Sequence, residues 1–103
     1  MSTPALPEVP MPDGCICEDG WQDNVDGLPE YRVISGADRR LFSIAGIVGT
    51  SAVQYPDGTI DQTPEDSPRV WSDFGAASMT SAQAREFAAA IIAAADEIDG
   101  WVQ

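Results

Sequence analysis

The strongest local pattern in this chain is that of an amphipathic α-helix close to its C-terminus. Between residues 81 and 99 apolar side chains recur every three or four positions, the spacing that gathers them on one face of a helix. This apolar stripe consists of Ala84, Phe87, Ala88, Ile91, Ala95 and Ile98. We expect the Phe87, Ile91 and Ile98 side chains to pack onto a small antiparallel sheet.

Both ends of this helix carry signals of their own. Thr80 followed by Gln83 has the sequence of a capping box, in which each side chain bonds the other residue's backbone N–H. Gly100 is placed to end the helix in a left-handed conformation, with Trp101 and Val102 folding back onto it.

Short segments rich in β-branched and aromatic residues precede the helix and predict strands at residues 31–35 and 69–74. Residues 41–48 are apolar on both alternating sides, which predicts a central strand covered on both faces. Pro56, Asp57 and Gly58 form a turn signal before the chain returns. The fold class is therefore α+β: a small antiparallel meander of three to four strands, packed by one C-terminal helix.

Residues 1–29 differ from the rest of the chain because five prolines interrupt them and acids crowd their second half. Proline fixes φ and lacks a backbone donor, so we expect an extended acidic arm here and one α+β domain over residues 30–103. Trp21 and Leu28 are the side chains that could anchor this arm to the domain.

The composition argues against several classes of function. Seventeen acids against five arginines give a net charge of −12, which opposes binding to nucleic acid or to anionic membranes. There is no lysine and no histidine, so the commonest general base, Schiff-base nucleophile and metal ligand are all missing. We expect a non-enzymatic protein without a cofactor. The acidity is consistent with a solubilising surface or, alternatively, with a decoy that mimics DNA.

Cys15 and Cys17 are too close in sequence for an ordinary intrachain disulfide, and the N-terminus does not resemble a signal peptide. Residues 87–95, the longest apolar run, are too few to span a membrane. We therefore expect a cytoplasmic protein with reduced thiols. A thiolate metal site at the cysteine pair is an alternative, although a structural zinc site needs four ligands and a second chain would have to supply two.

Several exposed features predict an interaction surface. Tryptophan is enriched at the centres of interfaces, and alanines on the back of the helix would let another helix approach closely. Acids also crowd the negative end of the helix dipole, where they are locally unfavourable. The residues singled out for interaction are Trp21, Trp71, Ala89, Ala93, Asp96, Glu97 and Asp99. A homodimer would cover the second apolar face of residues 41–48.

The second half of the chain resembles a family of short proteins from mycobacteria and their phages. The likeness rests on Gln54-Tyr55-Pro56-Asp57-Gly58, on a following strand, and on the alanine-rich helical segment 79–97, which is similar to endings of the type T-x-x-Q-A-R-x-L-A-A-A-L-x-x-A-A-D-E. The resemblance implies a setting rather than an activity. It suggests a phage or prophage accessory protein that binds a host protein or itself.

Overall fold

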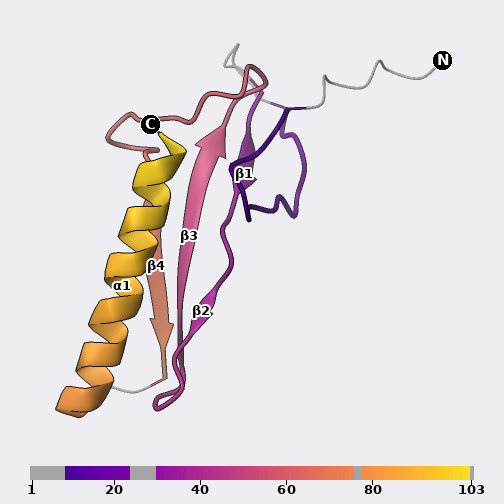
Figure 1. Cartoon of the computed structure of the whole chain (residues 1–103). Helices are drawn as coiled ribbons and strands as arrows, with labels where there is room; N and C mark the ends of the chain where they lie inside the picture. Colours follow the sequence, from indigo (N-terminus) through magenta and orange to yellow (C-terminus); the bar gives the residue numbers. More distant parts are fainter. Residues whose placement is uncertain (1–8, 24–29, 76–77, 103) are drawn as a thin grey trace.

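A computed structural model describes residues 9–23, 30–75 and 78–102 of the chain. It forms a four-stranded antiparallel sheet with one long helix along one side (Figure 1). The elements are β1 (Arg32–Ile34), β2 (Arg39–Arg40), β3 (Gly46–Gln54), β4 (Arg69–Phe74) and α1 (Ser81–Trp101). The predicted α+β fold, a small antiparallel sheet with a C-terminal helix, is confirmed.

The long strand β3 is the centre of the sheet. It pairs with β4 along one edge, whereas β1 and β2 follow each other along the opposite edge. Ile34 pairs with Ala52 and Arg39 pairs with Val48, so the connection between β1 and β2 holds one residue more than the stretch of β3 beside it. That extra residue makes a bulge. β1 and β2 are therefore one interrupted strand of a simple meander.

The core lies between β3 and the helix. Side chains on alternate residues of a strand point to opposite faces, and every second residue of β3 is buried on the helix side: Val48, Thr50, Ala52 and Gln54. Ile34 of β1 is fully buried on the same side. Phe74 of β4 meets Phe87 of α1 edge to face, with ring centroids 4.3 Å apart. The prediction that Phe87 packs onto the sheet is confirmed.

The start of α1 also attaches the helix to the β2–β3 connection. The predicted capping box is confirmed: the hydroxyl of Thr80 accepts from the Gln83 N–H at 3.1 Å, and the Thr80 N–H donates to Gln83 Oε1 at 2.9 Å. The Gln83 amide nitrogen then donates to the Ser43 carbonyl at 2.6 Å. Glu86 accepts from the Phe42 N–H at 2.8 Å.

The predicted end of the helix is wrong. α1 continues through Gly100 to Trp101, with Val102 as the C-cap, and Gly100 is not in the left-handed conformation. Residues 87, 94 and 101 are spaced by two turns, so the extra turn places Trp101 on the same face as Phe87 and Ala94. Trp101 is half-buried there.

The predicted apolar stripe is rotated relative to the observed contact face. Ala94 is the fully buried residue of the helix, whereas Ala84 and Ala88 of the stripe are exposed. Polar anchors on one flank cause this rotation, because Glu86 bonds the β2–β3 connection and Glu97 makes an ion pair with Arg39 of β2 at 2.8 Å.

The prediction of a two-sided apolar strand over residues 41–48 is also wrong. The strand begins only at Gly46, and residues 42–45 form a bend in which Phe42 is 98% exposed. The Leu41 N–H donates to the Gly46 carbonyl at 3.1 Å, which closes the connection tightly. The backbone donor of Phe42 bonds Glu86 of the helix, so a tertiary contact replaces the expected strand pairing.

The described part of the N-terminal arm lies beside β1. Ile16 exchanges backbone hydrogen bonds with Ser35, and Gln22 with Tyr31, while the residues between them bulge away from the strand. Trp21 takes the anchoring position that the sequence predicts, because the guanidinium of Arg32 lies 4.5 Å from its ring centroid. Leu28, the other predicted anchor, lies outside the described residues.

Candidate functional site

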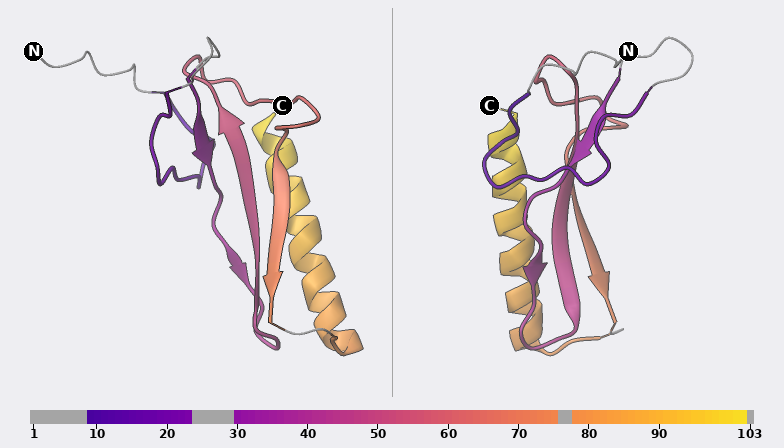
Figure 2. Two further views of the ribbon diagram at one scale, coloured as in Figure 1. Left: turned by 180° about the vertical axis from the view of Figure 1, so that it is seen from behind. Right: turned by 90° about the vertical axis from the view of Figure 1, so that its right-hand side faces the viewer.

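Within the part of the chain that the structure describes, no helix or second sheet covers the face of the sheet opposite α1 (Figure 2). Strand alternation and pairing place on it Ile47, Gly49, Ser51 and Val53 of β3, with Val33 and Trp71 on the neighbouring strands. Val33 is 45% exposed and Trp71 is 40% exposed. Large apolar side chains gathered on one uncovered face are typical of an interaction site rather than of ordinary surface.

Trp71 owes its position to a glycine on the central strand. Gly49 pairs with Trp71 across the β3–β4 ladder, and any Cβ at Gly49 would collide with the six-membered ring of the indole. The absence of a side chain therefore lets the indole lie across β3. This arrangement presents a broad apolar surface on the open face.

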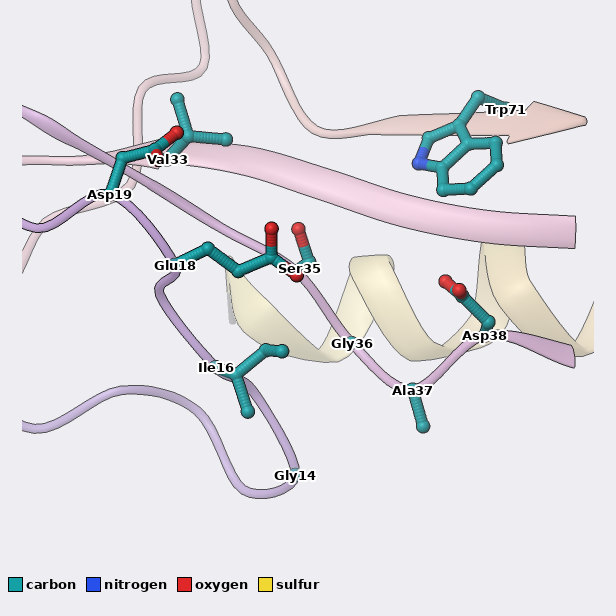
Figure 3. Close-up of a pocket in the computed structure, with 10 residues that line it drawn as sticks. All are labelled: Gly14, Ile16, Glu18, Asp19, Val33, Ser35, Gly36, Ala37, Asp38 and Trp71. Atoms are coloured by element: carbon teal, nitrogen blue, oxygen red, sulfur yellow. The ribbon is translucent and has the colours of Figure 1, made fainter.

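The bulging arm and this face enclose a cavity of about 560 Å³. Ile16, 55% exposed, lines the arm side, while Val33 and Trp71 line the sheet side (Figure 3). The bulge between β1 and β2 supplies the remaining wall through Ser35, Gly36, Ala37 and Asp38. Ile16 and Val33 are among the residues that the sequence did not reveal, because Val33 and Ile34 are adjacent and both apolar, so no polar–apolar alternation marks Val33 as the outward one.

Three carboxylates surround this apolar cavity: Glu18, Asp19 and Asp38, all of them exposed. In Figure 3 the Asp38 carboxylate is directed towards the Trp71 side of the cavity. Within the described ranges none of the three makes an ion pair with an arginine. The rim is therefore negative, which favours neutral or cationic groups of a partner over anionic ones.

The structure does not bring the predicted interaction residues together. Trp71 lines the cavity, whereas Trp21 packs on Arg32 at the arm. Glu97 is half-buried and engaged by Arg39. The other four, Ala89, Ala93, Asp96 and Asp99, are exposed on α1, away from the open face.

Tyr55 and Asp61 form a second polar cluster whose role is structural. The Tyr55 hydroxyl donates to the largely buried Asp61 carboxylate, which also accepts from the Thr63 N–H at 2.8 Å and the Thr63 hydroxyl at 2.7 Å. The three hydrogen bonds lower the pKa of Asp61, and the bond from the Thr63 hydroxyl has the largest effect. The hydrogen bond to Asp61 in turn raises the pKa of Tyr55. Because all three donors bind one carboxylate, Asp61 holds the loop after β3 in place.

Cys15 and Cys17 are both half-buried free thiols in the described arm. Burial, and then the negative charge of Glu97, raise the pKa of Cys15 to about 11. A metal takes a thiolate rather than a thiol, so this environment works against coordination at Cys15. Among the residues that the structure describes, no three Cys, Asp or Glu side chains are grouped so that they could hold a metal ion.

We expect Cys15 to react slowly with iodoacetamide at pH 7.5–8.5 because only a small fraction is thiolate well below a pKa of about 11. Its alkylation rate should rise about tenfold per pH unit through this range, as measured by mass spectrometry of the modified peptide. A Glu97→Gln variant should react faster at the same pH. A rate already level by pH 8 would contradict the raised pKa.

Comparison with protein families, with curated proteins and with solved structures finds no match to this chain. Over the described residues, no helix combines the length and the apolar character needed to cross a membrane.

Proposed function

We propose that this protein is a non-enzymatic protein-interaction module whose open sheet face receives its partner. The observation that carries the proposal is the set of large apolar side chains on that face, Ile16, Val33 and Trp71, each at least 40% exposed. They line one cavity instead of being scattered singly over the surface. A partner that covers them would remove this apolar area from water, which is the main driving force for association.

We also propose a biological context for this interaction. The resemblance in the second half of the chain supports an accessory protein of a phage or prophage, acting in the host cytoplasm on a host protein or on itself. A decoy of DNA would instead need carboxylates in a phosphate-like array on one surface. Exposed acids here occur on separate elements, such as Glu18 in the arm, Asp57 in a turn and Asp96 in α1, which favours the interaction module.

Substituting the open face should abolish partner capture. We expect Trp71→Ser and Val33→Ser to lose proteins that the wild-type chain retains from a mycobacterial lysate, quantified by mass spectrometry. Phe42→Ser is the matched control, because Phe42 is an even more exposed aromatic residue that lies outside the cavity. Trp71→Ser and Val33→Ser each remove exposed apolar surface from the open face, so we expect these two variants to lose capture without losing their fold.

Circular dichroism checks that the variants remain folded. Capture that survives both open-face substitutions, or that is lost only with Phe42→Ser, would show that this face is not the interface.

A further inference from the structure

We propose that a second copy of this chain pairs with the first along the free edge of β4, in an antiparallel two-fold arrangement that joins the two sheets. This inference goes beyond the proposed function, because it concerns the edge of the sheet and the helix above it rather than the open sheet face. Three features of the β4 side carry it: an unpaired main chain, a self-complementary pair of charges, and an uncovered apolar flank of α1.

The outer edge of β4 is open. In the described chain β4 pairs with β3 alone, in a register without interruption from Arg69 to Phe74. The Gly75 N–H donates to the carbonyl of Ala45, the residue just before β3, at 3.2 Å. Along an antiparallel strand, residues whose main-chain groups point to one neighbour alternate with residues whose groups point to the other side, so residues 69, 71 and 73 bond β3. The N–H and C=O groups of Val70, Ser72 and Phe74 therefore point outward. Such an edge is a template for pairing with another strand.

One register makes the two edges complementary. If Trp71 lies on the two-fold axis, Arg69 of each copy stands opposite Asp73 of the partner subunit, and this happens twice by symmetry. Both side chains are exposed and lie on the open face beside Trp71. Opposite charges directly across a strand pair stabilise it. Sliding either strand by two residues places Arg69 opposite Trp71 or Gly75 and loses both pairs.

The helix flank above β4 is apolar, and no other described segment covers it. The side chains of Gln83, Glu86 and Glu97 reach β2 and the β2–β3 connection, which defines one flank of α1. By helical geometry the opposite flank lies on the β4 side and carries Ala84, Ala88, Ile91 and Ala95. Ala84 and Ala88 are exposed, and the neighbouring Ile92 is 61% exposed.

The geometry of the two layers lets both contacts form together. α1 packs over β3 and β4, and neighbouring strands lie about 4.8 Å apart. Pairing two β4 strands would place the two α1 axes about 10 Å apart, which is a normal helix-packing distance. The two helices would run antiparallel and meet through alanines, which permit close approach. Strand pairing at the β4 edge and helix packing at the α1 flank can therefore form in the same dimer.

Net charge opposes this association, since each copy carries −12. Repulsion between charges farther apart than about 8 Å is largely screened at physiological ionic strength. The test is therefore made at about 0.15 M salt, where this long-range repulsion is largely screened.

Sedimentation equilibrium of the full chain tests the interface. We expect the wild-type protein to sediment as a dimer, and Ala88→Glu to weaken dimerisation at least tenfold by introducing a carboxylate between the helices. Ala89→Glu is the matched control. It makes the same change at the adjacent exposed position, on a part of the helix that faces away from β4, and should leave the dimer unchanged.

Charge exchange tests the register. Arg69→Asp and Asp73→Arg alone should each weaken the dimer at least tenfold, because each places like charges opposite each other twice. The double variant Arg69→Asp/Asp73→Arg restores opposite charges and should recover most of the lost affinity. Circular dichroism verifies folding, since Arg69 also donates to the Pro64 carbonyl at 2.6 Å.

The outcomes separate this inference from the proposed function. A strict monomer at all concentrations, or equal effects of Ala88→Glu and Ala89→Glu, would overturn the β4 dimer even if Trp71-dependent capture of another protein persists. A dimer that responds as expected, without any capture by the open face, would instead leave self-association standing and count against a separate partner at that face.

Discussion

Replacing Gln54 with alanine is expected to lower the free energy of unfolding by about 3 kcal/mol. Gln54 is 1% exposed, and its amide links three separate segments. Its Oε1 accepts from Arg32 Nε at 2.8 Å, while its Nε2 donates to the carbonyls of Pro10 at 3.0 Å and Gly58 at 3.3 Å. Truncation leaves these groups without their partner and opens a cavity, and both effects are unfavourable.

The loss of local stability in Gln54→Ala should be largest in the N-terminal arm. Arg32 holds the carbonyl of Val9 at 2.7 Å and the ring of Trp21, so a displaced guanidinium releases the contacts that dock the arm beside β1. Hydrogen exchange should therefore accelerate at residues 15–22 more than in β4. Denaturant unfolding measures the global change, and mass spectrometry of the exchanged peptides measures the local one.

Gln22→Ala is the matched control for this prediction. The Gln22 amide bonds the carbonyls of Asp19 and Gly20 within the arm itself, so its removal should cost less than about 0.5 kcal/mol. Equal destabilisation by the two substitutions would show that Gln54 does not connect the arm to the sheet.

Gly36→Ala is expected to destabilise the protein by about 2 kcal/mol. Gly36 is buried in the bulge between β1 and β2, and a Cβ there would lie 2.6 Å from both Glu97 Oε2 and Thr50 Oγ1. The Gly36 N–H also donates to Thr50 Oγ1 at 3.1 Å. To make room, Glu97 must move away from Arg39, and the helix loses an anchor on β2.

Gly100→Ala provides a control of opposite sign. Gly100 lies within α1 with no atom near the position of an added Cβ, so alanine should stabilise the helix by about 0.5–1 kcal/mol.

In a Glu97→Ala background, Gly36→Ala should lower the free energy of unfolding by less than it does in the wild type, because one of the two obstructing groups is gone. Chemical denaturation of the wild type, the three single variants and the Gly36→Ala/Glu97→Ala double variant measures these changes. An unchanged cost in that background would exclude Glu97 as the cause.

The pattern of residues was sufficient for the elements whose signals are local. Thr80 and Gln83 cap α1 where the sequence predicts, and β4 occupies residues 69–74 as expected. The start of β3 was not predictable in this way. Residues 41–48 look like a continuous strand, but Glu86, far away in sequence, takes the backbone donor of Phe42. The site was predicted only through Trp71, because the cavity depends on a bulged arm that no local pattern describes.

The sequence by itself determined the class of fold, the lack of histidine and lysine chemistry, and the amphipathic character of the helix. These properties depend on residue types and on spacing along one segment. The rotation of α1 and the identity of its exposed flank were decided only in the tertiary structure, as were the position of Trp71 over Gly49 and the open edge of β4. Each of these depends on contacts between segments distant in sequence, such as Glu97 with Arg39, whose geometry arises only when the sheet and helix meet.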